Sequence, residues 1–248
     1  MKESISFDRI ADRYDETRGG EQRGDTLAAD IDPYLGDAER VLEVGVGTGI
    51  VAAGLGRLGR PVVGVDVAAE MLARAHERLG SRVARADAHA LPVPTASVDG
   101  AYLVWVLHVV ADPAAVIAEC ARVLRPGSRL VVIAGHPRTG DAGDMTEYSA
   151  TLDHIRTDRP DNAEAVAAWA HAAGLERLAY KELVETHSST PADFADVIEK
   201  RSFSWIWDLD EQTWNEVVQP VIDGLRALPE PTRGRSVTLR RDLLAFTR

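Results

Sequence analysis

The sequence predicts an α/β protein built on a doubly wound, mostly parallel sheet, and three observations lead to this prediction. Short apolar runs alternate with segments of helical periodicity along the chain. The run at 97–104 suits a strand in the middle of a parallel sheet, where both faces are buried. The third observation is the apolar run at 41–44, which leads directly into closely spaced glycines and then into a helical pattern. With 248 residues, the chain is expected to form one domain.

The composition argues against several classes of function. The formal net charge of −11 opposes binding to a nucleic acid, because that affinity depends on lysine and arginine contacts to phosphate. We interpret the basic stretch 233–241 as a solvated strand face. The single cysteine, Cys120, allows neither an intramolecular disulfide nor a cysteine metal cluster, and no bound metal is expected. The start of the chain has no apolar run of signal or membrane-spanning length, so the expected location is the cytoplasm, with no membrane partner.

The segment 41–50 contains the predicted binding turn. Its apolar strand runs into Gly45, Gly47 and Gly49, which are spaced two residues apart. Glycine has no Cβ, so the backbone here can adopt positive φ and approach a bound molecule closely. The helical spacing that begins at Ile50 predicts a helix whose N-terminal amides face the same ligand.

A second predicted strand, at 61–65, ends at Asp66 and places a carboxylate beside the glycine turn. Such a carboxylate can accept hydrogen bonds from both hydroxyls of a ribose, which predicts a nucleoside ligand. The ligand could be a dinucleotide, because 47–52 matches the G-x-G-x-x-A fingerprint, or S-adenosylmethionine. Glu43 favours the second, since its carboxylate would repel a pyrophosphate but attract a sulfonium and an ammonium.

Further motifs follow in order along the chain. They are Glu43-x-Gly45-x-Gly47-x-Gly49, Asp66 with Met71-Leu72, Asp87-Ala88, Leu91-Pro92 and Arg122-Val123-Leu124-Arg125-Pro126-Gly127. This series resembles the motifs of class I S-adenosylmethionine-dependent methyltransferases, and is most similar to the small-molecule enzymes of the ubiquinone and menaquinone biosynthesis type. The resemblance covers about residues 5–135 and fades beyond them.

The resemblance implies a Rossmann-like sheet of seven strands, the last one antiparallel, within a single domain spanning 1–248. It also implies a helical cap at 1–38 and a helical lid inserted at 187–231. The implied reaction is methyl transfer from S-adenosyl-L-methionine to a small-molecule acceptor by in-line displacement, leaving S-adenosyl-L-homocysteine. The nucleophile (oxygen, nitrogen or carbon) stays open, and so does the choice between a monomer and a homodimer.

The resemblance also implies which residues bind the cofactor. Asp87 and the amide of Ala88 would read the adenine, and Arg18 would pair with the methionine carboxylate. Alternatively, Tyr14 and Met71 only fill the core, and Arg18 is an exposed arginine. Ala68 stands where the family usually has a serine cap, which predicts a loss of about 1 kcal/mol of helix stability. The full predicted set is Tyr14, Arg18, Glu43, Gly45, Val46, Gly47, Gly49, Asp66, Val67, Met71, Asp87, Ala88 and Val104.

The acceptor is expected at the carboxyl end of the predicted strand 97–104, because ligands of open α/β sheets bind there. His108 is a titratable group of this rim and a candidate general base, although it could instead only shape the turn. The aromatic residues of the predicted lid could line an organic pocket or pack the lid onto the domain. The predicted acceptor contacts are Trp105, His108, His136, Phe203, Trp205 and Trp207.

Two other functions remain possible from the sequence. A nicotinamide-dependent oxidoreductase would use the same glycine turn, but it leaves Glu43 and Asp87 without an explanation. A non-catalytic cofactor-binding module on the same fold would lack an acceptor pocket. The segment 141–161 is polar and weakly periodic, which predicts a mobile flap.

Overall fold

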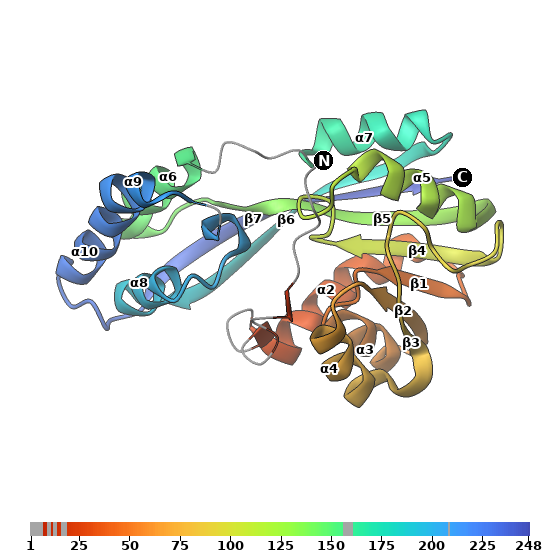
Figure 1. Ribbon diagram of the computed structural model, residues 1–248, viewed down its shortest axis with the longest axis horizontal. Helices are drawn as coiled ribbons and strands as arrows, with labels where there is room; N and C mark the ends of the chain where they lie inside the picture. The colour runs from red at the N-terminus through yellow and green to blue at the C-terminus, as the bar shows by residue number, and fades with distance from the viewer. Residues whose placement is uncertain (1–6, 9–10, 12–13, 16–18, 156–160, 208) are drawn as a thin grey trace. The chain divides into compact units, whose positions relative to one another are not determined.

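The computed structural model describes residues 7–8, 11, 14–15, 19–155, 161–207 and 209–248, and the side chains of all of these except His136 and Ser204. Its strands form a seven-stranded sheet in the order β3-β2-β1-β4-β5-β7-β6 (Figure 1). The strands are β1 (Val41–Val44), β2 (Val62–Asp66), β3 (Val83–Arg85), β4 (Val98–Val104), β5 (Leu124–Thr139), β6 (Glu176–Ser189) and β7 (Arg235–Thr247).

Helices connect these strands. The α-helices are α2 (Gly20–Leu35), α3 (Ile50–Arg57), α4 (Ala69–Leu79), α5 (Pro113–Val123), α6 (Thr146–Ile155), α7 (Ala163–Ala172), α8 (Pro191–Glu199), α9 (Glu211–Thr213) and α10 (Gln219–Ala227). Shorter elements are the 3₁₀-helices η2 (Gly80–Arg82), η3 (Gly143–Met145) and η4 (Ser204–Ile206), and the π-helix η5 (Trp214–Val218).

The sheet is mostly parallel, as predicted. β1 pairs in parallel with both β2 and β4, so that Val41 lies opposite Val62 on one side and Gly100 on the other. β7 is antiparallel, because the start of β5 pairs with the end of β7. The Gly127 amide donates to the Arg248 carbonyl at 2.7 Å, and the Gly140 amide donates to the Thr238 carbonyl at 2.7 Å. The doubly wound α/β prediction is therefore confirmed.

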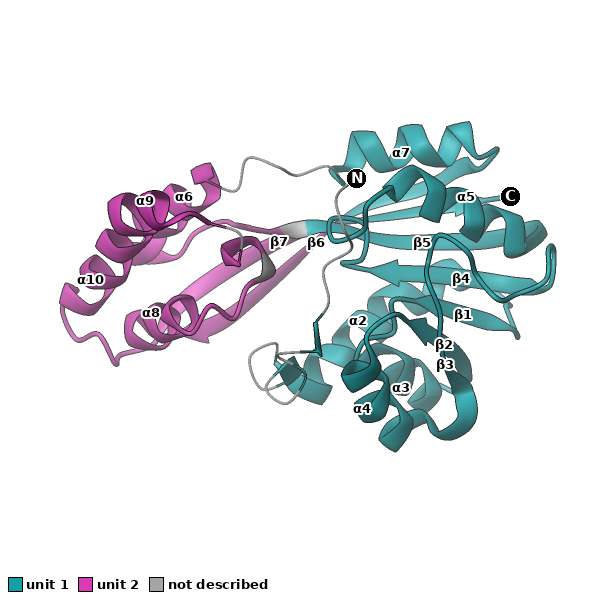
Figure 2. Cartoon of the chain, in the orientation of Figure 1, with its two compact units in different colours: residues 1–135, 160–181, 242–248 teal, residues 136–159, 182–241 magenta. Residues whose placement is uncertain are grey.

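The chain divides into two compact units (Figure 2). Unit 1 comprises Met1–Gly135, Pro160–Lys181 and Asp242–Arg248, and unit 2 comprises His136–Arg159 and Glu182–Arg241. In unit 1, α5 and α7 pack together on one face of the sheet, and α2 and α3 pack together on the other (Figure 1). Apolar residues of β1, β4, β5 and α5 fill its core, and Cys120 is fully buried among them.

Unit 2 has an apolar core of its own, formed by α6, α8, α10 and the segments between them. Within the predicted flap at 141–161 the structure forms η3 and α6 over 143–155, two elements that were not predicted, and the mobility of the segment stays a prediction. The fully buried residues of α6 are Leu152 and a small polar residue, Ser149, so the apolar periodicity of the sequence is weak there. The predicted lid at 187–231 falls within unit 2.

Candidate active site

A cavity of about 180 Å³ lies in unit 1, at the carboxyl ends of β1, β2 and β4. β2 and β3 lie on one side of β1, and β4 and β5, which follow them in the chain, lie on the other side. The strand order therefore reverses at β1, and open α/β sheets bind ligands at such a switch point. The cavity is lined by Phe7, Tyr14, Val44, Gly45, Gly47, Val65, Asp66, Val67, Ala68, Met71, Ala86, Asp87, Ala88, Val104, Trp105, Val106, Val109 and Val110.

The three glycines of the turn after β1 all have positive φ, which is 77° at Gly45, 54° at Gly47 and 80° at Gly49. The surroundings of the three differ, as a Cβ built on each of them shows. A Cβ on Gly45 would lie 2.3 Å from Val106 Cγ2, and one on Gly49 would lie 3.0 Å from Leu79 Cδ1. A Cβ on Gly47 would meet no protein atom within 4 Å, and Gly47 lines the cavity. Side chains therefore exclude residues other than glycine at 45 and 49, whereas at 47 the open space is available to a ligand.

Asp66 ends β2 and fixes the glycine turn. Its Oδ2 accepts from the Gly47 amide at 2.8 Å, and its Oδ1 accepts from the Ala68 amide at 2.9 Å. Burial raises the pKa of Asp66 above its ordinary value, while these amide hydrogen bonds oppose the shift. A carboxylate accepts up to about four hydrogen bonds, so both oxygens can still bind hydroxyl groups of a ligand in the cavity.

Glu43 lies beneath the turn and is 2% exposed. Its Oε2 accepts from the Tyr102 hydroxyl at 2.7 Å, and its carboxyl also accepts from the backbone amide of Ala52 in the first turn of α3. Burial raises the pKa of Glu43 to about 8, and the nearby charge of Asp66 adds to this rise. Glu43 thus joins β1 to β4 and caps α3, and it does not line the cavity.

The N-terminal segment closes one wall of the cavity. Phe7 and Tyr14 line it, with their rings edge to face and their centroids 6.1 Å apart. Asp15 anchors this segment, because its Oδ1 accepts from the buried Thr48 hydroxyl at 2.5 Å and its Oδ2 pairs with Arg78 at 2.7 Å. The glycine turn and the N-terminal segment are therefore held to each other by side chains as well as by the cavity wall.

The helix α4 begins without a cap from its own N-cap residue, Ala68. The carboxylate of Asp8 supplies the missing acceptor, since its Oδ1 accepts from the Glu70 amide at 2.9 Å. The predicted capping loss at Ala68 is thus offset by a residue 62 positions away in the sequence. Met71, on the same helix, is 2% exposed, packs with Ala11 and also lines the cavity, so both interpretations of Met71 fit its position.

Asp87 and Ala88 line the cavity on the side of β3. The Asp87 Oδ1 accepts from the His89 amide at 2.9 Å and lies 2.6 Å from His89 Nδ1, and these two interactions lower the pKa of Asp87. The loop that follows is held from α5. Glu119 accepts from the Leu91 amide at 2.8 Å, and Arg122 donates to the Leu91 carbonyl at 3.1 Å. The motif at 87–92 is therefore held by hydrogen bonds to the helix that contains the motif residue Arg122.

Trp105 follows β4 and lines the cavity, with an unusual backbone conformation for a residue with a side chain (φ 54°). Such a conformation costs on the order of 1–3 kcal/mol and persists only where its surroundings impose it. Here the Trp105 amide donates to the Ile133 carbonyl at 3.1 Å, and the Arg23 guanidinium stacks 4.4 Å from the ring centroid. The first contact holds the Trp105 backbone and the second holds the indole ring.

His108 lies three residues further on, and its side chain is 8% exposed. Its Nδ1 lies 3.5 Å from Oδ2 of Asp161, whose side chain is 1% exposed. The same Asp161 oxygen accepts from the Gly135 amide at 2.9 Å, at the end of the unit 1 part of β5. His108 does not line the cavity, although its neighbours Val106 and Val109 do.

Comparison with known proteins supports a family assignment. A family model described as a methyltransferase domain matches residues 42–132. The demethylmenaquinone methyltransferase of Mycobacterium marinum is 36% identical over 130 residues, which is 51% of this chain and 56% of that protein. The demethylmenaquinone methyltransferase of Mycobacterium sp. (strain KMS) is 33% identical over 189 residues, covering 69% of this chain and 80% of that protein. The chain belongs to the class I S-adenosylmethionine-dependent methyltransferases.

The fold agrees with this assignment. A solved S-adenosylmethionine-dependent methyltransferase from Thermotoga maritima superposes with a TM-score of 0.57 over 97% of each chain, at 20% identity. The cofactor of the family is S-adenosylmethionine. The cavity fits an adenosyl ligand, because Gly47 leaves open space at the turn and two carboxylates, those of Asp66 and Asp87, border it.

Most residues predicted to bind the cofactor line this cavity. They are Tyr14, Gly45, Gly47, Asp66, Val67, Met71, Asp87, Ala88 and Val104, together with the predicted acceptor contact Trp105. Glu43, Val46 and Gly49 instead lie outside its lining, where Val46 fills the space above Gly64 and Gly49 packs against α4. Arg18 lies outside the described residues, as does the side chain of His136.

Sequence reasoning missed several lining residues. Phe7 shares a helical face with Tyr14 in the sequence, and Val106, Val109 and Val110 directly follow Trp105, so neighbourhood alone could have found them. Asp161 carries no motif and is 53 residues from His108, so only the fold brings it there. Phe203, Trp205 and Trp207 belong to unit 2, where the rings of Phe203 and Trp205 stack 6.0 Å apart, and their role in acceptor binding stays a prediction.

Two searches of the described part of the chain gave negative results. None of its helices is both long enough and apolar enough to cross a membrane. Its histidine, cysteine, aspartate and glutamate residues form no group of three or more suited to hold a metal ion.

Proposed function

We propose that this protein transfers the methyl group of S-adenosylmethionine to a small organic acceptor by in-line displacement. The observation that carries the proposal is the composition of the cavity wall. Beyond the glycine turn and the two carboxylates, the wall is apolar and aromatic, formed by Phe7, Trp105, Val106, Val109 and Val110. A nucleoside would occupy the polar end, and the apolar end would be left for the acceptor.

The chain's own residues would act mainly by binding and positioning. Bound S-adenosylmethionine supplies a methyl group that its sulfonium has already activated. Asp66 and Asp87 would orient the ribose and the adenine, and the apolar wall would exclude water. Positioning of this kind is worth roughly 7 to 11 kcal/mol of barrier when the reacting atoms are aligned. The family's other members do not fix the acceptor, since one fold serves many substrates.

An apolar, ring-bearing acceptor fits this wall best. Trp105 contributes a large aromatic side chain to the cavity lining, and its contact with Arg23 holds the ring in place. The two mycobacterial relatives described above are demethylmenaquinone methyltransferases, whose names point to quinone-type acceptors. Since the chain spans 56% of the length of the Mycobacterium marinum relative, its acceptor does not follow from that name. A cytoplasmic location, and a monomer or homodimer, also stay predictions.

His108 remains our candidate base for an acceptor with a hydroxyl group. A buried carboxylate at Nδ1 favours the tautomer that carries the proton on that nitrogen, and this leaves Nε2 to accept a proton. Asp161 lies at that position. The sequence alone supports four further candidate acceptor contacts, which are His136, Phe203, Trp205 and Trp207.

The test compares two glycine-to-alanine variants, one at a position that borders the cavity and one at a position that does not. Gly47→Ala and Gly59→Ala both place a methyl group on left-handed backbone, where it would meet no protein atom within 4 Å. Only Gly47 borders the cavity. We expect Gly47→Ala to weaken S-adenosylhomocysteine binding at least ~10-fold by calorimetry, because overpacking costs about 1–3 kcal/mol, with little change for Gly59→Ala.

Activity is measured as S-adenosylhomocysteine formation from S-adenosylmethionine with a panel of hydroquinones, phenols and amines. With a hydroxyl acceptor, His108→Gln is expected to lower turnover about 100-fold while the cofactor affinity stays unchanged. A wild-type protein that binds NADH in the cavity and not S-adenosylhomocysteine would instead support an oxidoreductase. Cofactor binding without methyl transfer to any acceptor of the panel would support the non-catalytic module.

A further inference from the structure

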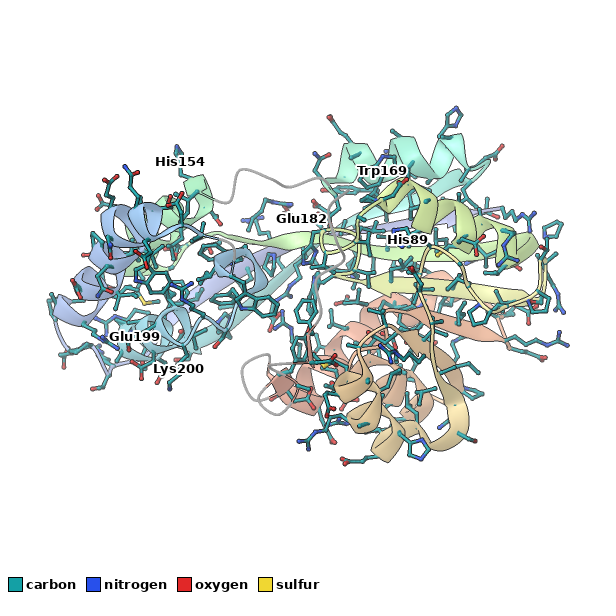
Figure 3. The ribbon with its side chains drawn as sticks, in the orientation of Figure 1. His89, His154, Trp169, Glu182, Glu199 and Lys200 are labelled. Carbon is teal, nitrogen blue, oxygen red and sulfur yellow. The ribbon has the colours of Figure 1, made fainter. Side chains whose placement is uncertain are left out.

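The imidazole of His89, which Figure 3 labels, lies between Asp87 of the cavity lining and Asp112 at the start of α5. On one side, its Nδ1 is 2.6 Å from Oδ1 of Asp87, a residue of the cavity lining. On the other side, its Nε2 is 3.2 Å from the backbone amide of Asp112. Asp112 is the N-cap of α5, and its own Oδ1 accepts from the Ala115 amide at 3.0 Å. The ring is therefore fixed at both nitrogens.

These partners determine which nitrogen carries the proton. A backbone amide can only donate, so Nε2 must accept from Asp112 and cannot carry a hydrogen. In the neutral ring the proton is then on Nδ1, which donates to the Asp87 carboxylate. Oδ1 of Asp87 accepts both this hydrogen bond and the one from the His89 amide.

The consequence concerns Asp87. The side chain of Asp87 is 62% exposed, whereas that of His89 is 22% exposed, so the histidine is the better anchored partner. With Oδ1 engaged by His89, the carboxylate cannot turn freely, and its Oδ2 is left to accept from a ligand. A rigid carboxylate acceptor distinguishes an amino group, which donates, from a carbonyl oxygen at the same position, which it repels.

We propose that His89 is a specificity-determining positioning residue, which holds the Asp87 carboxylate so that it selects the 6-amino group of an adenine ring. This inference rests on the proposed binding of an adenosyl cofactor in the cavity. It extends that function, because it assigns the choice of purine to a pair of residues of which one does not touch the ligand.

The experiment compares two ligands that differ only at position 6 of the purine. Dissociation constants for S-adenosyl-L-homocysteine and S-inosyl-L-homocysteine are measured by calorimetry for the wild type and for His89→Ala, His89→Asn and Asp87→Asn. Asparagine places an amide donor close to the position of Nδ1 and lacks the acceptor at Nε2. His76→Ala removes an exposed histidine of α4 and serves as the matched control.

The wild type should prefer the adenosyl ligand, and Asp87→Asn should lose this preference. His89→Ala should reduce the preference about 10-fold, which is the size expected for losing one charge-assisted hydrogen bond. His89→Asn should retain most of it, and His76→Ala all of it. A structural defect at position 89 would weaken both ligands equally and leave the ratio unchanged, and that result would overturn the inference while leaving the cofactor assignment intact.

A second measurement needs no variant. Nitrogen-15 NMR of the histidine rings in the wild-type protein reports the tautomer of each ring, and His89 should carry its proton on Nδ1. A ring protonated on Nε2 in the neutral form would contradict the inference. If the wild type binds neither purine ligand, the proposed function fails first, and this outcome is distinct from an unchanged ratio.

Discussion

Glu43 shows how burial changes the meaning of a charged residue. The sequence places a carboxylate next to the glycine turn, and we predicted that its charge attracts a cationic ligand. In the structure the carboxyl is buried, bonded to Tyr102 and to the first turn of α3, and its pKa is raised to about 8. Near pH 7 it therefore mostly keeps its proton. Its described contacts are structural, and the preference for a cationic ligand cannot rest on its charge.

This shift predicts a pH dependence of stability. Glu43 has a folded pKa of about 8 against an ordinary value of 4.5, so the folded protein binds more protons between these values. Its contribution is complete below about pH 4.5 and is lost as the pH rises through about 8. Glu43→Gln cannot ionise and avoids this loss. Between pH 5 and pH 9 we expect the variant to gain roughly 3 to 5 kcal/mol relative to the wild type.

The measurement is urea denaturation of both proteins at several pH values, without ligand. The exposed Glu77→Gln is the control and should follow the wild type throughout. Parallel curves for Glu43→Gln and the wild type across this range would show that Glu43 ionises normally in the folded protein.

Some residues of the site were predictable and others were not. Gly47 and Asp66 are predictable because their chemistry requires one residue type next to a strand end, and Asp87 is predictable from the family resemblance; all three line the cavity. His89 carries no such signal, since nothing in the sequence indicates that its ring reaches the amide of Asp112. Asp161 could not be found for the same reason. Contacts between side chains distant in sequence depend on the packed fold.

At the scale of elements, the order of strands and helices in unit 1 followed from the alternation of apolar runs. The helix cap of α4 did not. Sequence reasoning considers only the residue that precedes a helix, and Ala68 has no acceptor, whereas the structure supplies one from Asp8 in the N-terminal segment. The element α6 was also missed, because its buried face includes a polar residue, Ser149.

The Asp8 cap predicts a specific pattern of stability changes. Asp8→Ala should lower the free energy of unfolding by about 1 kcal/mol, the usual value of an N-cap acceptor. Ala68→Ser offers the same helix a cap from its own N-cap position. It should therefore restore most of the loss in the Asp8→Ala background and add little to the wild type, where the Glu70 amide already has an acceptor.

Urea denaturation of the four proteins without ligand gives this double-mutant cycle. Equal stabilisation by Ala68→Ser in both backgrounds would mean that Asp8 does not cap α4. We also expect Asp8→Ala to lower the cofactor affinity, because Asp8 belongs to the segment whose Phe7 and Tyr14 line the cavity. Ala68→Ser should not restore this affinity.

At the scale of the whole molecule, the charge distribution bears on which partners the protein accepts. The arginines at 233–241 form a basic stretch in the sequence, but in the structure each has a carboxylate partner. Arg233 pairs with Glu230, Arg235 with Asp144, Arg240 with Glu182 and Arg241 with Glu185. The stretch thus offers little uncompensated positive charge, and the net charge of −11 adds a general repulsion toward phosphate.

Glu182 allows the two effects to be separated, because it pairs with both Arg138 and Arg240 (Figure 3 labels Glu182). Glu182→Gln would remove the shared carboxylate from the ion pairs with Arg138 and Arg240 and change the net charge only from −11 to −10. We expect neither the wild type nor this variant to shift a DNA duplex or a folded RNA in native gels at about 50 mM salt, where phosphate contacts are strongest. Binding by Glu182→Gln alone would show that local pairing, and not the net charge, keeps nucleic acid away. Salt-sensitive binding by the wild type would contradict the prediction itself. The arginines of 233–241 would then have to exchange their carboxylate partners for phosphates, although the net negative charge of the protein repels phosphate.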